Sequence, residues 1–350
     1  MTTRVGALAI ALTDDQAFLV TKPANVRYLS GYSGSNGILL VSRNEATLFT
    51  DSRYAISSKQ ECFDVEIEVT PDLIDSVCKK GGFSELFFES GNLTVAIYNR
   101  LQNLLPSVKF SVSSNPVEAL RVVKDQRELE LISTACQIAT AALSELVSQS
   151  LVGNSEIEIS RTLEAKMIEL GADSIAFETI VATGPNSAIA HHQPTNRQLQ
   201  AGEFLKIDFG AKIAGYHSDC TRTFIAGDAS QWQLEIYEQV QLAQSASRAA
   251  LANGVALSSV VEPTIKQFES SGFLDKFGHG LGHGVGLEIH EDPFLSVKST
   301  ATLERGTVVT VEPGLYLAQK GGVRIEDTVV VTETGYENLT NFPHELLQIS

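Results

Sequence analysis

The chain has 350 residues, which is enough for two domains that each bury a core. Its 42 acidic and 26 basic residues give a net charge of −16, and this balance argues against a general nucleic-acid binder and against a protein of anionic membrane surfaces. The four cysteines form no Cys-x-x-Cys pair, so we expect reduced thiols in a cytoplasmic protein rather than a zinc knuckle or a disulfide framework. No stretch approaches the roughly 20 apolar residues of a membrane-spanning helix.

The first 120 residues are expected to form a small α/β domain. Apolar, β-forming runs predict strands at residues 18–20, 37–41, 47–50 and 85–89. Residues 73–80 and 93–105 carry apolar side chains at helical spacing. Because strands and helices alternate, we expect a mostly parallel or mixed sheet in this domain.

Residues 121–350 follow a different pattern and are expected to form a second, larger domain. From residue 117 to 152 the chain is almost free of glycine and proline, which predicts one or two helices, and a capping pattern at Ser155 predicts a further helix to residue 170. Helices at 232–252 and 257–271 and strands at 307–311 and 323–331 follow. A helix pair and a hairpin thus occur twice, which suggests two structurally similar halves without a sequence repeat.

Two short β-forming segments, residues 205–210 and 218–223, each contain an aspartate and predict a β-hairpin. If the turn is centred between Ile213 and Ala214, Asp208 and Asp219 lie directly opposite each other, with Cβ atoms about 5 Å apart. Two carboxylates this close repel each other unless a proton or a cation lies between them. The pair therefore requires a neutralising partner.

Three further segments carry side chains suited to the same site. Residues 277–291 alternate glycines with His279, His283 and His290, and such glycines let the backbone pass close to a bulky or charged group. A nucleotide-binding loop is the competing interpretation, but the segment has no G-x-G-x-x-G pattern and no phosphate-binding lysine. Glu312 ends an apolar strand, and Glu326 lies in a strongly β-forming run, where a buried carboxylate is costly unless it is paired or binds a metal.

The simplest alternative for Glu326 is an ion pair with Arg324, two residues away on the same strand face. Taken together, however, four acids on strands built for burial and one histidine on a glycine-lined strand predict a site with several negative charges, which two divalent cations would balance. A carboxylate-bridged metal pair is a known way to build a hydrolase. Oxygen-rich ligation with a single imidazole favours Mn²⁺, with Co²⁺, Fe²⁺ and Zn²⁺ as alternatives.

These residues also carry a family resemblance. The motifs IDFG, SDCTRTF, GHGLGHGVGLEIHE, VEPGLY and GGVRIEDT contain, in order, Asp208, Asp219, His283, Glu312 and Glu326. In these motifs the chain resembles the pita-bread metallopeptidases (family M24), within the group of Xaa-Pro aminopeptidase and Xaa-Pro dipeptidase (prolidase). Residues 23–32 are similar to the creatinase-type N-terminal domain of the proline-specific members. The resemblance implies an α/β N-terminal domain, residues 1–120, and an α+β pita-bread catalytic domain, residues 121–350, with pseudo-twofold related halves.

Carried over residue by residue, the resemblance implies two divalent metal ions. Asp208 would chelate one ion, and His283 with Glu312 would hold the other. Asp219 and Glu326 would bridge the two. A water between the ions would be the nucleophile, and Glu312 would be the general base that takes its proton.

The resemblance also assigns side chains to the substrate. His191 matches the histidine upstream of the first aspartate, which is expected near the scissile bond or the substrate amine. His279 and His290 match the two histidines that flank the metal ligand, contact the substrate carbonyl and stabilise the tetrahedral intermediate. Arg324 and Tyr316 resemble residues that support the metal ligands from the next layer.

The three remaining histidines need a separate interpretation. His192 competes with its neighbour His191, but the position of His191, seventeen residues before the first aspartate ligand, matches the family register. His217, in the hairpin, is expected on the surface or lining the substrate site, because the five ligand positions are already filled. His344, near the C-terminal end, is expected on the surface.

A proline-specific peptidase, acting on Xaa-Pro bonds, is the favoured function. Ordinary peptidases do not cleave these bonds, because proline forms a tertiary amide and has a fixed φ. The expected substrate is a peptide with proline at the second position, cleaved before the proline by an aminopeptidase; the alternative is a dipeptidase restricted to Xaa-Pro. A strict dipeptidase needs a cation for the substrate carboxylate, and some prolidases carry an arginine where this chain has Phe294. This departure, together with the segment 31–37, favours the aminopeptidase, and an arginine from elsewhere in the chain is the alternative source of that cation.

Two further implications of the resemblance concern other classes and assembly. Creatinase-like or binding members of the family are not peptidases, but they usually lack part of the five-residue ligand set that this chain retains. Metal content separates the two classes, since a binding protein has no need of two metal equivalents.

Members with this N-terminal domain are commonly dimers, so we expect a homodimer.

Overall fold

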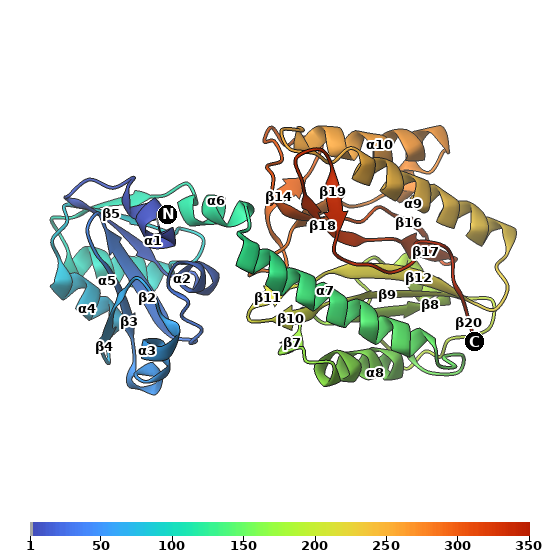
Figure 1. The fold of residues 1–350 in the computed structure, drawn as a ribbon, viewed down its shortest axis with the longest axis horizontal. Helices are drawn as coiled ribbons and strands as arrows, with labels where there is room; N and C mark the ends of the chain where they lie inside the picture. Colours follow the sequence, from blue (N-terminus) through green and yellow to red (C-terminus); the bar gives the residue numbers. More distant parts are fainter. Residues whose placement is uncertain (1–2) are drawn as a thin grey trace. The chain divides into compact units, whose positions relative to one another are not determined.

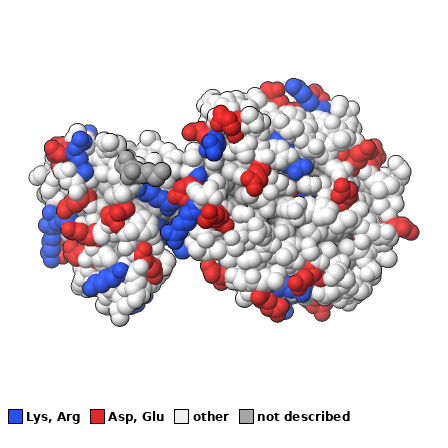
Figure 2. Space-filling model, viewed as in Figure 1, with Lys and Arg blue, Asp and Glu red and all other residues white. Residues whose placement is uncertain are grey.

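The computed structural model describes residues 3–350. The chain divides into two compact units, the first ending at Arg121 and the second spanning Val122–Ser350 (Figure 1). On the face that Figure 2 shows, acidic and basic side chains are interspersed over both units. None of the helices within residues 3–350 is long and apolar enough to cross a membrane.

The first unit is built on one six-stranded sheet. Its elements are α1 (Arg4–Ala9), β1 (Gln16–Val20), α2 (Pro23–Ser30), β2 (Gly37–Ser42), β3 (Ala46–Thr50), η1 (Ser52–Tyr54), α3 (Ser57–Glu61), β4 (Glu66–Val69), α4 (Leu73–Lys80), β5 (Glu85–Phe88), α5 (Val95–Leu104), β6 (Lys109–Val112) and, at the division, α6 (Pro116–Val122). The strand order is β4-β3-β2-β1-β5-β6, with β1 antiparallel to β2 and parallel to β5, so the sheet is mixed. Val77 of α4 and Leu101 of α5 pack with Leu19, Leu40 and Leu86 in its core.

The second unit contains two halves that each combine a pair of helices with a mainly antiparallel sheet. The first half comprises α7 (Gln126–Val147), α8 (Glu156–Glu169), β7 (Ser174–Ile175), β8 (Ile180–Thr183), η2 (Gly184–Ala188), β9 (Phe204–Phe209), β10 (Ala211–Ile213), β11 (Tyr216–His217) and β12 (Cys220–Ala226). The second half comprises α9 (Gln231–Ala249), α10 (Leu257–Ser270), η3 (Leu274–Lys276), β13 (Gly282–Gly284), β14 (Glu291–Leu295), β15 (Val308–Val311), β16 (Gly314–Leu317), β17 (Gly321–Arg324), β18 (Asp327–Val331) and β19 (Tyr336–Asn338), after which β20 (Gln348–Ile349) returns to β12.

Local signals in the sequence set where the helices of this unit begin. Asp125 caps α7 in a capping box with Glu128, and Ser155 caps α8 in the same way with Glu158. The apolar faces of these two helices then pack on the sheet β20-β12-β9-β8, where Leu143 and Leu163 share a core with other buried side chains of the sheet. The second half repeats the arrangement with α9, α10 and the sheet β14-β13-β15-β18-β19 (Figure 1).

The predicted hairpin forms, but its register differs by two residues from the expected one. Asp208 pairs with Thr221 rather than with Asp219, and the turn is centred on Ala214 and Gly215. Both turn residues have positive φ, which glycine adopts without strain, so Gly215 fixes the turn one residue later than predicted. Because side chains alternate with a period of two, the shift leaves both aspartates on the same face of the sheet.

The predicted strand at residues 323–331 is two strands. β17 ends at Arg324 and pairs with β16, whereas β18 begins at Asp327 and pairs with β15. Ile325 and Glu326 lie between them, and the Glu326 amide donates to the carbonyl of Thr221 on β12 at 3.1 Å. The break carries the chain from one pairing to the other and brings Glu326 to the hairpin.

Candidate metal centre

Five side chains from separate elements of the second unit meet in one cavity of about 320 Å³. They are Asp208 on β9, Asp219 between β11 and β12, His283 on β13, Glu312 directly after β15, and Glu326 in the break between β17 and β18. The structure therefore brings together all five residues that the sequence predicts as metal ligands, although they are spread from position 208 to position 326 of the chain.

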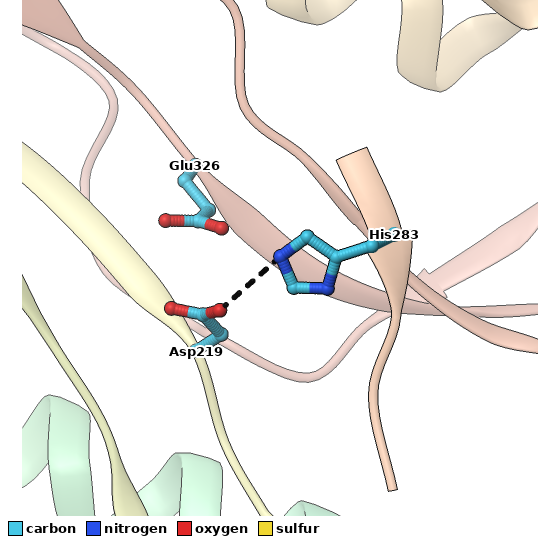
Figure 3. Close-up of side chains that lie close together, drawn as sticks. All are labelled: Asp219, His283 and Glu326. Atoms are coloured by element: carbon cyan, nitrogen blue, oxygen red, sulfur yellow. Dashed lines mark ion pairs between the residues drawn. The ribbon is translucent and has the colours of Figure 1, made fainter. Parts of the chain in front are cut away.

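Three of the five stand close enough to share an ion. Ligand atoms of Asp219, His283 and Glu326 all lie within 4.8 Å of one another, and all three residues are buried. Figure 3 shows the His283 ring pointing toward both carboxylates. Its Nε2 atom is 3.6 Å from Asp219 Oδ2 and 3.4 Å from Glu312 Oε1, distances that leave no direct hydrogen bond of good length.

The hydrogen bonds of His283 assign its tautomer. Nδ1 lies 3.1 Å from the carbonyl oxygen of Gly284, which can only accept, so the ring proton is on Nδ1. Nε2 then turns its lone pair toward the carboxylates of Asp219 and Glu312. A lone pair facing carboxylates is unfavourable without a cation between them, and this is the form in which histidine binds metals.

Asp208 also has a carboxylate oxygen that a cation could bind. Its Oδ2 accepts a hydrogen bond from the buried guanidinium of Arg324, whereas the buried Oδ1 has no hydrogen-bond partner among residues 3–350. A buried carboxylate oxygen without a partner is costly, and a bound cation removes that cost. Arg324 thus pairs with Asp208 instead of forming the Glu326 pair considered from the sequence. It reaches Glu326 through the hydroxyl of Thr221, which accepts from Arg324 Nε at 3.0 Å and donates to Glu326 Oε2 at 2.6 Å.

The carboxylates shift one another's ionisation. Burial, reinforced by Glu326 and Asp208, raises the pKa of Asp219 well above its ordinary value. Burial, with Glu312 and Asp208, raises the pKa of Glu326 in the same way. Burial also acts to raise the pKa of Glu312, but the surrounding histidines and Arg324 together outweigh it and the net shift is downward. Such an oxygen-rich set suits hard divalent cations.

The residues expected around the substrate lie at the same cavity. His191, His279, His290 and Arg324 line it, together with the apolar side chains Phe177, Ile180, Ile289 and Phe294. Tyr316 accepts from Arg324 Nη1 at 3.0 Å and lies 2.9 Å from His279 Nε2. Because His279 Nδ1 also faces the carbonyl of Gly280 at 2.7 Å, both ring nitrogens of His279 are engaged within the protein.

The other histidines are held elsewhere. His192 is buried, with Nε2 2.8 Å from Glu156 Oε2. His217 takes neither of the two expected positions, because it is buried and is not among the residues that line the cavity. Its Nδ1 lies 2.9 Å from the Gly286 carbonyl, and burial lowers its pKa to about 4. His344, expected on the surface, is half-buried, and its Nε2 lies 2.7 Å from Asp327 Oδ2.

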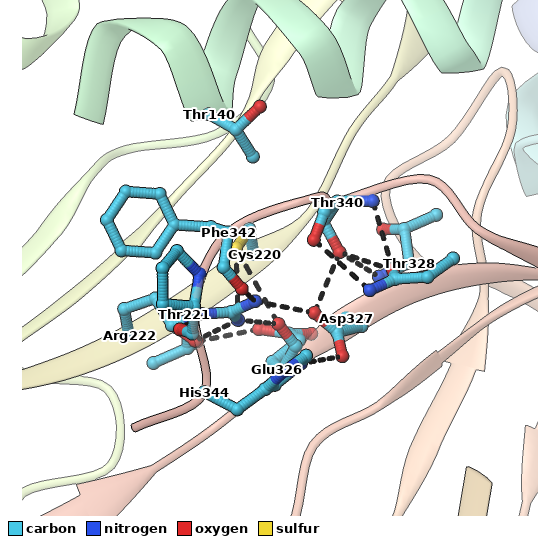
Figure 4. Close-up of polar contacts among 12 residues, drawn as sticks. Thr140, Cys220, Thr221, Arg222, Glu326, Asp327, Thr328, Thr340, Phe342 and His344 are labelled. Carbon is cyan, nitrogen blue, oxygen red and sulfur yellow. Dashed lines mark hydrogen bonds and ion pairs between the residues drawn. The ribbon is translucent and has the colours of Figure 1, made fainter. Parts of the chain in front are cut away.

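Asp327, the residue after Glu326, is a buried centre that the sequence reasoning missed. Its carboxylate accepts from Arg222 Nη2 at 2.7 Å and forms an ion pair with Arg248 at 2.9 Å, and His344 and Thr340 contact it from the C-terminal segment (Figure 4). Arg222 in turn donates to the carbonyl of Glu326. The one available signal was a second acid inside the same β-forming run. This cluster fixes the backbone behind the site.

The chain matches two protein-family models. Residues 130–333 match Metallopeptidase family M24, and residues 10–123 match the Creatinase/Prolidase N-terminal domain. The chain belongs to metallopeptidase family M24. As a member of this family it is a peptidase, and therefore a hydrolase.

Full-length relatives support the assignment. The Xaa-Pro dipeptidase of Pyrococcus furiosus is 36% identical over 338 residues, 95% of each chain. The solved structure of an Xaa-Pro dipeptidase from Bacillus anthracis is 36% identical with a TM-score of 0.94, covering 99% of this chain and 98% of that one. That of an X-Pro aminopeptidase from Thermotoga maritima is 34% identical with a TM-score of 0.91, covering 98% and 100%. The M24 peptidase thus has the expected fold class, an α/β N-terminal domain and an α+β pita-bread domain with pseudo-twofold related halves.

Proposed function

We propose that this M24 peptidase binds two divalent cations and hydrolyses the bond between an N-terminal residue and proline. One observation carries the proposal: five predicted ligands converge on one cavity, where the His283 lone pair faces carboxylates and the buried Asp208 Oδ1 has no hydrogen-bond partner among the described residues. Asp208 would hold one cation, and His283 with Glu312 the other. Asp219 and Glu326 would bridge them. The donor set favours Mn²⁺, with Co²⁺, Fe²⁺ and Zn²⁺ as alternatives.

The side chains around the cations would manage the proton and the substrate. When bound, the two cations activate water and polarise the scissile carbonyl. Glu312 would take the proton of the attacking water, because its carboxylate lines the cavity beside the other candidate ligands. Arg324 keeps Asp208 oriented, and Tyr316 extends this support to His279.

Two histidines are free to meet the substrate. His191 and His290 line the cavity and are exposed, so each can donate to the scissile carbonyl or meet the substrate amine. His279 can make the substrate contact implied by the family resemblance only by giving up its hydrogen bond to Tyr316.

The comparisons favour the dipeptidase over the aminopeptidase that Phe294 suggested. The Pyrococcus furiosus relative and the Bacillus anthracis structure, which share 36% identity with this chain, both carry the name Xaa-Pro dipeptidase. We therefore propose Xaa-Pro dipeptidase activity as the main function. The apolar side of the cavity, with Ile289 and Phe294, is suited to a proline ring.

Aminopeptidase activity is the second candidate, and one feature of the cavity favours it. Among the described residues, Arg324 is the one cationic side chain that lines the cavity, and it is buried and paired with Asp208. It is therefore not available for a free carboxylate beside proline, which a dipeptide always carries.

Cleavage of matched substrates separates these functions. Metal-stripped protein is refilled with Mn²⁺ and given Ala-Pro, Gly-Pro, Ala-Pro-Ala and Arg-Pro-Pro. Hydrolysis confined to the dipeptides supports the dipeptidase, and release of the first residue from the longer peptides supports the aminopeptidase. No cleavage of any of the four with Mn²⁺, Co²⁺, Fe²⁺ or Zn²⁺ would refute the proposed specificity.

We further propose that the protein is a cytoplasmic homodimer. The resemblance supports the dimer, and the four cysteines, all free in the structure, fit a reducing compartment. Sedimentation equilibrium of the full chain tests the oligomeric state.

A further inference from the structure

The segment that carries His191 runs between β8 and β9 with little regular structure of its own. It begins with the short 3-10 helix η2 and continues irregularly to residue 195. Of the described residues 184–195, His191 alone lines the cavity, and it is exposed. An irregular segment can place a side chain accurately only if the backbone on both sides of it is fixed from elsewhere.

Lys206 fixes the backbone before His191. It is fully buried on β9, and its Nζ donates to the carbonyl oxygens of Ser187 at 3.0 Å, Ile189 at 2.7 Å and Ala190 at 3.4 Å. Lysine is rarely buried to this degree, and here its Nζ donates to main-chain oxygens of one short segment. Ala190, which directly precedes His191, also accepts from Arg324 Nη1 at 3.2 Å. The backbone entering His191 is thereby tied to the arginine that holds Asp208.

Glu156 fixes the backbone after His191 and the start of the segment. It is fully buried in the first turn of α8, and its two oxygens accept hydrogen bonds from four residues of the region. The donors are Thr183 N and Oγ1 at 2.8 and 2.9 Å, Asn186 Nδ2 at 2.9 Å, His192 Nε2 at 2.8 Å, and Thr195 N and Oγ1 at 2.9 and 2.7 Å. One carboxylate thus joins both ends of the segment and holds the residue next to His191.

We propose that Lys206 and Glu156 are positioning residues that hold His191 at the substrate. Lys206 secures residues 187–190 and Glu156 secures residues 183, 186, 192 and 195, so His191 lies between the two anchors. Neither side chain lines the cavity. The inference rests on the proposed function, because it takes His191 to act on an Xaa-Pro substrate.

Kinetics of single and double variants test this role. Lys206→Met and Glu156→Gln are expected to lower kcat/KM for the better of Ala-Pro and Ala-Pro-Ala by about 10–100-fold, the loss that a small misplacement of a substrate-contacting group produces. Bound metal per folded protein is expected to stay unchanged. The double variant Lys206→Met/His191→Ala is expected to be no slower than His191→Ala alone, because the positioned group is already gone. Lys166→Met is the control, since Lys166 on α8 forms an ion pair with Glu145 on α7 and neither residue lines the cavity.

A second readout does not depend on activity. In Lys206→Met, backbone hydrogen exchange is expected to accelerate within residues 186–192 while the amides of β9 and β12 stay protected. Wild-type activity with unchanged exchange in both variants would overturn the proposal. So would a loss of bound metal, or a double variant whose defects multiply, since either result assigns Lys206 to general stability. If the wild type cleaves no Xaa-Pro peptide, the proposed function fails, and the exchange result still decides whether Lys206 fixes this segment.

Discussion

Asp219 is the residue at which metal binding and stability are most directly linked. Its carboxylate is buried and faces His283 and Glu326 (Figure 3). Burial and the neighbouring carboxylates raise its pKa well above the ordinary 3.8, so the charged form is unfavourable in the folded protein without cations. Bound cations reverse this effect, because they favour the charged form.

Replacing Asp219 by asparagine removes one negative charge at nearly constant volume. We expect Asp219→Asn to lose at least one equivalent of bound Mn²⁺ and to lower kcat/KM about 100-fold or more, because this side chain is proposed to bridge both ions. Metal analysis of the purified protein and steady-state hydrolysis measure the two effects. Asp275→Asn, at an exposed ion pair with Lys276, is expected to match the wild type; full metal content in Asp219→Asn would contradict its role as a ligand.

The same substitution should have the opposite effect on the metal-free protein. An acid whose pKa is raised by folding keeps its proton in the folded state after losing it in the unfolded state, so wild-type stability is expected to fall as pH rises above about 3.8. Asp219→Asn lacks this penalty, and we expect it to be the more stable protein at neutral pH. Urea unfolding in chelator at pH 5 and pH 7 measures both. If Asp219→Asn is less stable than the wild type at pH 7, the negative charges of the buried carboxylates do not destabilise the metal-free protein.

At the scale of elements, β13 carries His283 between two neighbouring strands. It fits there because its glycines have no side chains that would collide with those strands. It pairs with β14 on one side and β15 on the other. A Cβ on Gly282 would lie 2.1 Å from the carbonyl oxygen of Thr310, which real Cβ atoms do not do. The glycines of this motif therefore serve close strand packing beside a metal ligand.

Gly282→Ala is expected to displace β13 and with it His283. We expect a loss of roughly 1–3 kcal/mol in the free energy of unfolding, from overpacking against backbone, and a weakened affinity for Mn²⁺. Gly278→Ala is the matched control from the same motif, because a Cβ there meets nothing within 4 Å. Equal stability and Mn²⁺ affinity in the two variants would contradict this account of the motif.

Which features could be predicted from the sequence depends on how local their causes are. The helix start at Ser155 and the apolar strands follow from neighbouring residues, so periodicity and capping suffice to predict them. The capping box at Asp125, which begins α7, was not predicted, although it has the same pattern. The five candidate ligands could be predicted for two reasons. A buried carboxylate in an apolar strand is energetically costly unless it is paired or binds a metal, and the motifs around these residues resemble a known family. The hairpin register was missed because it depends on Ala214 adopting positive φ beside Gly215.

Apart from Arg324 and Tyr316, which the family resemblance indicated, the supporting side chains could not be predicted because their partners lie far away in the chain. Arg222 and Asp327 meet across 105 positions, and Glu156 gathers donors that lie 27 to 39 positions further along. For Asp327 the neighbouring sequence offers only its place in a β-forming run, and nothing there distinguishes Glu156 from an ordinary surface charge. Only the tertiary structure shows that they are buried and paired.

At the scale of the whole molecule, the second unit contains the complete lining of the cavity. The lining residues run from Phe177 to Glu326, all within Val122–Ser350. We therefore expect a chain limited to Val122–Ser350 to fold by itself and to bind Mn²⁺ with the stoichiometry of the full protein. Circular dichroism and metal titration of this fragment check both expectations; a folded fragment that binds no metal would show that the first unit completes the site.

The most direct test of the central claim is the dependence of hydrolysis on added metal. Metal-stripped full-length protein is titrated with Mn²⁺ while cleavage of Ala-Pro, or of Ala-Pro-Ala if that is the better substrate, is followed. We expect no activity without metal and a rise that levels off at two equivalents per chain, with no such rise for Asp219→Asn. Full activity in the presence of chelator, or a plateau that Asp219→Asn reaches equally, would contradict a two-metal peptidase built on these five residues.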